Sequence, residues 1–225
     1  MWRECRRAMK PFAALSISER LFVAGRMRSA PLHQVAERAP PGRVVEVGCG
    51  HGALVALLAM RPDRRVLGID PDPRKIAWAK ASVGALENVE LRVATVDALE
   101  PGLAGSFDAA VIADVLYLLP VDAWEPFLAA AMSLLRPGGW LLLKDAEADG
   151  SWRYLKCVAQ EWLMVRLLRR TRSSGGLQFR PRAFTERLLL RLGFEDLRTT
   201  SLARGYTTPH LLFEARRPAE RLVLR

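Results

Sequence analysis

Three glycines at alternate positions follow a short apolar run in the first quarter of the chain. The run consists of residues 44–47, and the glycines are Gly48, Gly50 and Gly52. Glycine leaves the backbone N–H groups open to a ligand, and a helix beginning near Ala53 would aim its positive end at the same place. A second apolar run ends in Asp70, eighteen residues after the last glycine. This order of strand, glycine turn, helix and acidic strand tip predicts a site for a nucleoside-containing ligand.

The acidic residue inside the first run narrows the choice of ligand. From Glu46 onward the spacing is E-x-G-x-G-x-G, whereas a dinucleotide site prefers G-x-G-x-x-G. A carboxylate at this position would repel a pyrophosphate and attract a cation or an amino group. The charge therefore favours the cationic ligand S-adenosylmethionine (SAM) over NAD.

The glycine turn resembles the first motif of the class I SAM-dependent methyltransferases, and four later segments resemble further motifs of that family in order. They are Asp70 and residues 93–98, 107–120 and 134–143. The resemblance covers about residues 42–145 and, more loosely, the end of the chain. It implies SAM as methyl donor and S-adenosyl-L-homocysteine as its product. The cofactor site that it implies consists of Glu46, Gly48, Cys49, Gly50, Gly52, Asp70, Pro71, Asp97, Ala98, Ala113 and Asp114.

Two aspartates have particular roles in this resemblance. It implies that Asp70 binds the ribose hydroxyls and that Asp97 meets the adenine amino group. Each also has a plainer explanation, because Asp70 precedes Pro71 and Asp72 like a helix cap, and Asp97 could cap a turn. The motifs follow one another in the family's order, and we therefore expect the ligand-binding roles.

Apolar runs and helical segments alternate along the chain. Strands are expected near 43–48, 65–70, 89–94, 107–113, 139–145, 194–200 and 208–216, and helices near 53–60, 72–84, 121–135 and 181–192. Such alternation indicates a parallel sheet with helices on both faces. With the resemblance, it predicts an α/β fold with a doubly wound, mostly parallel, seven-stranded Rossmann-like methyltransferase sheet and an antiparallel last strand. We expect an N-terminal helical cap at 1–42, and at 43–225 the methyltransferase domain with a helical lid insertion.

The net charge of +10 is distributed unevenly. It is +5 over residues 1–42, −5 over 43–150, +8 over 151–191 and +2 over 192–225. The predicted cofactor domain is therefore acidic, while its flanks are basic. Five of the 34 basic residues are lysine, which a high-GC genome would explain, but codon bias does not explain how the charge is segregated.

The composition argues against several classes of protein. No uncharged apolar run reaches the roughly 18–20 residues that span a bilayer, and residues 1–7 lack the apolar segment of a secretory signal. Cys5, Cys49 and Cys157 are too few and too scattered for a disulfide framework or a zinc site, so we expect no metal. We expect a cytoplasmic protein, with peripheral contact at the membrane left open.

Residues 151–180 are expected to form a basic, amphipathic lid. Ser151 suits the N-cap of a helix of about five turns. Its apolar face would consist of Trp152, Leu155, Ala159, Trp162 and Leu163, widened by Val158, Val165 and Leu167. The cations are Arg153, Lys156, Arg166, Arg169 and Arg170, and a mobile loop is expected at 171–176.

Such a lid is compatible with several partners. It could close over an apolar small molecule, dock an acidic carrier protein or an anionic membrane surface through residues 151–191, or follow a nucleic-acid backbone. A partly buried helix with solvated arginines explains the same pattern without any partner.

Motifs of nucleic-acid methylation are missing from the chain. After residues 107–113 the sequence is Asp-Val-Leu-Tyr-Leu-Leu-Pro in place of [DNS]-P-P-[YF], and no Pro-Cys pair supplies a nucleophile there. We predict methyl transfer to a small-molecule or carrier-bound acceptor, at oxygen, by in-line displacement. The runner-up is an RNA methyltransferase that uses the basic flanks, and a third reading is a SAM-fold interaction protein without catalysis.

The sequence does not fix a general base. Candidates are His210, Asp114, Asp145 and Tyr117. His51 lies in the glycine turn and is expected to pack near the ligand, while His33 is expected at the surface. Arg26 and Arg28, on an N-terminal helix that could belong to the lid, are candidates to hold a carboxylate or phosphate of the substrate.

Overall fold

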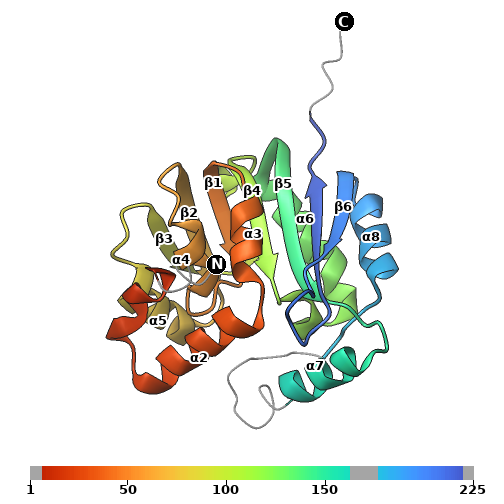
Figure 1. Cartoon of the computed structure of the whole chain (residues 1–225). Coiled ribbons are helices and arrows are strands. Elements are labelled where there is room, and N and C mark those ends of the chain that lie inside the picture. The colour runs from red at the N-terminus through yellow and green to blue at the C-terminus, as the bar shows by residue number, and fades with distance from the viewer. Residues whose placement is uncertain (1–6, 163–176, 220–225) are drawn as a thin grey trace, which may run out of the picture.

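The computed structural model describes residues 7–162 and 177–219, which build a sheet of seven strands (Figure 1). The strands lie in the order β3-β2-β1-β4-β5-β7-β6. They are β1 Gly42–Val47, β2 Arg64–Asp70, β3 Val89–Val93, β4 Phe107–Ala113, β5 Leu135–Ala146, β6 Glu195–Ser201 and β7 His210–Arg216. Neighbours among β1 to β5 pair in parallel, and β7 is antiparallel to both β5 and β6. The predicted sheet is confirmed.

Helices cover both faces of the sheet (Figure 1). They are α2 Ile17–Ser29, α3 Leu32–Arg38, α4 Ala53–Leu58, α5 Pro73–Val83, α6 Trp124–Leu134, α7 Trp152–Trp162 and α8 Arg182–Arg191. Short 3-10 turns lie at η1 Lys10–Ala14, η2 Val96–Ala98, η3 Pro101–Leu103, η4 Leu116–Leu118 and η5 Val121–Ala123. Within the described ranges no helix is long and apolar enough to cross a bilayer.

Alternate side chains of the central strands enter two separate cores. In β4, Ala109 and Val111 pack with α2 to α5, whereas Ala110 and Ile112 pack with α6 and α8. Successive side chains of a strand point to opposite faces, so a strand covered on both faces must be apolar throughout. This is why the strand segments appear in the sequence as continuous apolar runs.

The carboxyl ends of the parallel strands lie at one end of the molecule, where α2 and α7 are also found (Figure 1). The chain leaves β1 in one direction along the sheet, through β2 and β3, and returns to the other side of β1 at β4. Ligands of open α/β sheets bind in the crevice at such a switch point, outside the carboxyl ends of the strands. The fold therefore positions a site between the end of β1 and the end of β4.

One surface prediction is wrong. His33 was expected at the surface, but its side chain is buried in α3. The inner face of this helix also carries Leu32, Val35 and Ala36, and α3 packs against α4. The basic stretch before it gave no indication that this short helix is covered.

One helix and one strand begin at residues other than those predicted. The helix expected at 121–135 begins with the 3-10 turn η5, and α6 starts at Trp124. Strand β5 starts at Leu135, ahead of the expected 139, because Leu135 already pairs with Phe107 of β4. The predicted lid helix is described as far as Trp162, and its expected continuation and the loop at 171–176 lie outside the described residues.

Candidate functional site

The glycine turn brings backbone against an open space at the end of β1. Gly48 and Gly50 have φ of +80° and +55°, in the left-handed region that favours glycine. A Cβ added to Gly48 would lie 2.5 Å from Val115 Cγ2, whereas one added to Gly50 would meet nothing within 4 Å. Gly48 is thus required by packing with the segment after β4, and Gly50 borders the cavity itself.

Asp70 ties this turn to the tip of β2. The Gly50 N–H donates to Asp70 Oδ2 at 3.0 Å, the Asp72 N–H donates to Oδ1 at 2.9 Å, and Lys75 Nζ lies 3.8 Å from Oδ2. The cap of α5 is Asp72, whose side chain accepts from the Arg74 N–H. The alternative of Asp70 as that helix cap is therefore wrong, and its carboxylate is held at the rim of the turn.

A cavity of about 240 Å³ lies between the glycine turn, the end of β2, the end of β4 and helix α2. The predicted cofactor residues that line it are Glu46, Gly48, Cys49, Gly50, Asp70, Pro71, Ala113 and Asp114. Gly52 begins α4 instead, and Asp97 and Ala98 are exposed on η2 and do not line the cavity. The adenine contacts expected of Asp97 and Ala98 stay predictions.

Glu46 is a buried acid of the cavity wall, with 4 % of its surface exposed. Burial raises its pKa to about 8, the charge of Asp70 adds to the rise, and Arg26 and a backbone hydrogen bond from Val55 oppose it. Its Oε2 has no hydrogen-bond partner in the described part of the chain. A buried polar atom of this kind needs an explanation, and an ammonium or other donor of a bound ligand supplies one.

Asp114 is the centre of an ionic cluster that joins three elements. It has φ of +58°, unusual for a residue other than glycine. Lys144 of β5 lies 2.5 Å from its Oδ1, and Arg26 of α2 lies 2.8 Å from its Oδ2. Burial by itself would raise the pKa of Asp114, but the charges of Lys144 and Arg26 outweigh it and lower the pKa to about 2. Asp114 is therefore held as a carboxylate with both oxygens engaged.

His51 joins the glycine turn to helices α2 and α5. Its ring stacks on Trp78 at 4.7 Å between centroids and tilts against Phe22 at 4.9 Å. Glu19 Oε2 lies 3.6 Å from its Nε2. The expected packing role agrees with these contacts, and His51 also lines the cavity. Its approach to a ligand stays a prediction.

A second, smaller cavity of about 30 Å³ adjoins the first. Arg26, Asp114 and Tyr117 line both cavities, and the second continues to Gln160 and His210. Its size is that of about one water molecule or one functional group.

His210 presents a neutral ring to this recess. Its Nε2 lies 3.0 Å from the Ser29 carbonyl oxygen, which requires Nε2 to carry the proton. Burial and the charge of Lys144 lower its pKa to about 3. Its Nδ1 is then a hydrogen-bond acceptor, and among the described residues it has no partner.

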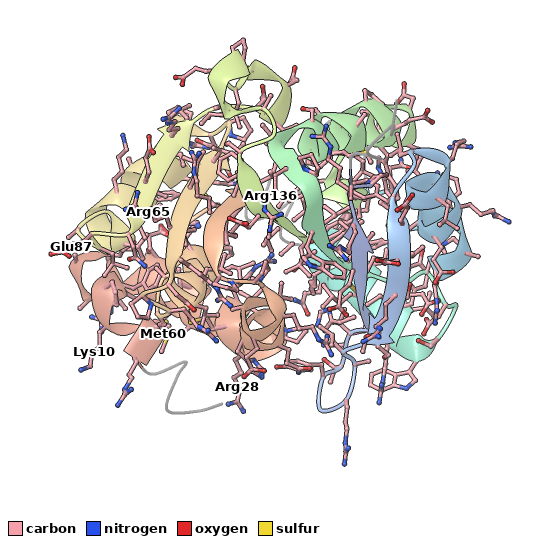
Figure 2. All side chains as sticks on the ribbon, turned by 90° about the horizontal axis from the view of Figure 1, so that it is seen from above. Lys10, Arg28, Met60, Arg65, Glu87 and Arg136 are labelled. Carbon is pink, nitrogen blue, oxygen red and sulfur yellow. The ribbon has the colours of Figure 1, made fainter. Side chains whose placement is uncertain are left out.

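The other residues proposed from the sequence as a general base or as substrate-binding arginines do not lie together. Asp145 is buried, and its Oδ1 accepts from the Ala146 N–H at 2.8 Å; it lines neither cavity. Arg28 is exposed and extends from the molecular edge (Figure 2), whereas Arg26 pairs inward with Asp114. The two arginines, equivalent in the sequence, thus differ in the structure.

Sequence reasoning missed Lys144, which stands among the leucines of β5 and is fully buried. A charged residue inside an otherwise apolar strand was the available signal, because a buried charge requires a partner. It also missed Phe22, Lys75 and Trp78, whose positions depend on how α2 and α5 pack. No local pattern identifies these three.

Comparisons with known proteins agree with this geometry. Residues 44–139 match the family model described as a methyltransferase domain. The chain is 31% identical over 170 residues to the ubiquinone biosynthesis O-methyltransferase of Xanthomonas campestris pv. campestris, a match that covers 74% of this chain and 64% of the relative. It is 37% identical over 145 residues to the trans-aconitate 2-methyltransferase of Deinococcus radiodurans, covering 60% and 52%. The chain thus spans less than two thirds of the length of either relative.

A solved structure shows the same fold. The apo form of the S-adenosylmethionine-dependent methyltransferase SibL superposes with a TM-score of 0.68 at 23% identity, over 92% of this chain and 61% of that one. The ordered motifs, the strand order with antiparallel β7 and the domain matched at residues 44–139 support membership of the class I SAM-dependent methyltransferase family.

Proposed function

We propose that the chain transfers the methyl group of SAM to an oxygen of a small-molecule or carrier-bound acceptor. The observation that carries the proposal is the larger cavity, where glycine backbone, Asp70 and the buried carboxyl group of Glu46, whose Oε2 has no partner among the described residues, converge. SAM bound there would supply a sulfonium methyl group for in-line displacement by an acceptor oxygen, with S-adenosyl-L-homocysteine as the leaving group and the proton of a hydroxyl acceptor released to solvent. The relative from Xanthomonas, named as an O-methyltransferase, supports oxygen as the acceptor atom.

Three ionisable side chains suit three parts of SAM. Glu46 would take the ammonium group, and Asp70 the ribose hydroxyls. Arg26 would take the carboxylate of the methionine part, because it is a cation that lines both cavities beside Ala113, whose carbonyl oxygen lies 3.5 Å from its Nη2. The other cation in the cavity wall, Lys75, lies at the opposite end beside Asp70.

Replacing Asp70 with alanine is expected to weaken SAM binding at least tenfold, about 1.4 kcal/mol. The change removes the ribose acceptor and the carboxylate that holds the Gly50 N–H. Isothermal titration calorimetry with SAM and S-adenosyl-L-homocysteine measures the effect. Asp63→Ala is the control, because Asp63 is an exposed carboxylate just before the same strand. If Asp70→Ala leaves the affinity unchanged, Asp70 only shapes the turn.

The second cavity would receive the reactive end of the acceptor. It shares Asp114 and Tyr117 with the larger cavity, so a group placed there lies next to the methionine end of that cavity. Nδ1 of His210 would accept a hydrogen bond from a hydroxyl and orient its oxygen. The low pKa of His210 makes it a weak proton acceptor, so we assign it orientation of the hydroxyl and expect no rate titration from it between pH 6 and 8.

Replacing His210 with phenylalanine is expected to lower kcat/KM for a hydroxyl acceptor about tenfold while SAM affinity stays unchanged, because a buried hydrogen bond is lost and a ring of similar shape remains. The acceptor is first identified by methyl transfer from labelled SAM to simple phenols, carboxylic acids and RNA. Tyr206→Phe is the matched control, since Tyr206 contacts the His210 ring edge-on. Equal losses in both variants would indicate a packing effect and remove the assigned role.

The same panel separates the proposal from RNA methylation. The basic charge of residues 1–42 and 151–191 is the observation that favours RNA. Methyl incorporation into RNA, together with RNA binding that falls steeply as the salt concentration rises, would identify RNA as the substrate in place of a small molecule. Absence of SAM binding at micromolar concentration would remove the enzymatic proposal altogether.

A further inference from the structure

The exposed apolar side chains of the protein gather on two helices. Large apolar side chains with high exposure are Ile17, Leu21, Met60, Val93, Trp152, Leu155, Trp162 and Leu190 in the described residues. Five of these eight lie on α2 and α7, with exposed fractions between 53 and 75%. We call Ile17, Leu21, Trp152, Leu155 and Trp162 the α2–α7 face. Large apolar side chains that are exposed together on a helix, in place of scattered single ones, point to an interaction site.

Helix α7 presents its aromatic stripe away from the protein body. The side chains that pack inward are Tyr154, Cys157 and Val158. Trp152, Leu155 and Trp162 lie on the other side of the helix and are exposed. The stripe that the sequence predicts as the apolar face is therefore not the face that packs on the domain. At 1.5 Å per residue it extends along about 15 Å.

Helix α2 repeats this arrangement. Val23 and Met27 pack into the core, whereas Ile17 and Leu21, on the opposite side of the helix, are exposed. Both helices lie at the end of the molecule where the parallel strands finish (Figure 1). Phe22 and Arg26 of the same helix line the larger cavity. The α2–α7 face is thus part of the layer that covers the functional site.

Basic side chains accompany this face. Arg20 and Arg28 on α2 and Lys156 on α7 are exposed, and Arg28 extends from the molecular edge (Figure 2). The Arg153 guanidinium lies 5.9 Å from the centre of the Trp152 ring. The acidic residue of α2, Glu19, is turned toward His51 at 3.6 Å. Exposed Trp, Leu and Ile mixed with cations are the composition of interfacial helices that bind anionic lipid.

We propose that the α2–α7 face docks on an anionic lipid bilayer. A bilayer suits it better than an acidic carrier protein, because the apolar side chains are spread along two helices at one end of the molecule and line neither of the two cavities described above. Tryptophan is favoured at the boundary between lipid and water, and cations bind the anionic headgroups. Docking would bring the layer that covers the cavity against the membrane, where an apolar acceptor is concentrated. The docking itself does not depend on the proposed methyl transfer.

The test is co-sedimentation of the full chain with sucrose-loaded vesicles. We expect binding to vesicles that contain phosphatidylglycerol, weaker binding to pure phosphatidylcholine, and loss of binding as salt rises. The triple variant Trp152→Ser, Leu155→Ser, Trp162→Ser should bind at least about tenfold less. The matched control is Met60→Ser, Val93→Ser, Leu190→Ser, which changes three exposed apolar residues elsewhere and should bind like the unmodified chain. Thermal unfolding and SAM affinity check that both variants are folded.

Charge is tested separately. The variant Arg20→Gln, Lys156→Gln should bind anionic vesicles less and with a flatter salt dependence, while Arg65→Gln, at the start of β2, should not (Figure 2). Absence of vesicle binding by the unmodified chain overturns the proposal, as does equal loss in the two triple variants. Binding to an acidic carrier protein without vesicle binding would assign the face to a protein partner.

Discussion

Replacing Asp114 with asparagine is expected to cost about 3–5 kcal/mol of the free energy of unfolding, the usual loss when one partner of a buried ion pair is removed. Lys144 is fully buried and lies 2.5 Å from Asp114, so the variant leaves its charge in the core without a counter-ion. Asparagine keeps the shape of the side chain and tolerates the φ of +58°. The loss in the free energy of unfolding therefore comes from the removed charge and not from backbone strain.

Urea denaturation at neutral pH measures this effect. The control is Asp108→Asn on the same strand, where the carboxylate pairs with Arg136 at 2.6 Å in a more exposed position. Asp108→Asn should lower the free energy of unfolding by less than about 1 kcal/mol. The double variant Asp114→Asn, Lys144→Met should recover much of the loss, because it removes both charges. Similar costs for Asp114→Asn and Asp108→Asn would contradict the role of the buried pair.

The same pair predicts a dependence on pH. The pKa of Asp114 is lowered from 3.8 to about 2 in the folded protein. Its contribution to stability is therefore fully present above about pH 4 and is lost as the pH falls toward 2, where the folded carboxylate takes up its proton. In Asp114→Asn this part of the acid destabilisation should be absent.

Binding of SAM near pH 7 is expected to release a proton from Glu46. With a pKa raised to about 8, chiefly by burial, most Glu46 is protonated at neutral pH. An ammonium group beside its Oε2 favours the carboxylate and so lowers the pKa. If binding requires the ionised form, affinity should rise up to tenfold per pH unit well below the pKa and about fiftyfold between pH 6 and 8.

Calorimetry in two buffers that differ in ionisation enthalpy counts the released protons. Glu46→Gln should bind SAM more weakly and without proton release, and its affinity should no longer change between pH 6 and 8. In the free protein the raised pKa acts in the opposite direction: stability should fall as pH rises from 4.5 toward 8, because the unfolded chain releases this proton first. A proton count of zero in the unmodified protein would show that Glu46 is not the ammonium partner.

The sequence predicted the sheet well because the determinants of its strands are local. Each strand buried on both faces needs a continuous apolar run, and the turns between strands and helices need glycine or a capping side chain. Glu46 and Asp70 could be found in the same way, since a residue at the end of a parallel strand reaches the ligand edge in this fold. The antiparallel β7 was available only through the family resemblance.

Tertiary packing decided the remaining features. Arg26 and Arg28 are two residues apart on one helix, yet the first pairs with Asp114 and the second is exposed, because only one face of α2 contacts the domain. His33 and Lys144 are buried by elements far away in the chain. The tryptophan stripe of α7 has the periodicity of a buried face, but the narrower side with Cys157 packs inward.

The sequence by itself determined the succession of strands and helices up to β5 and the position of the cofactor edge, because these follow from strand ends, glycines and periodicity within short segments. Only the tertiary structure decided which charges meet at Asp114, which tautomer His210 adopts and which face of α7 remains in water. These features depend on distances between residues such as Arg26, Lys144 and His210, which approach one another only when α2, β5 and β7 are packed together.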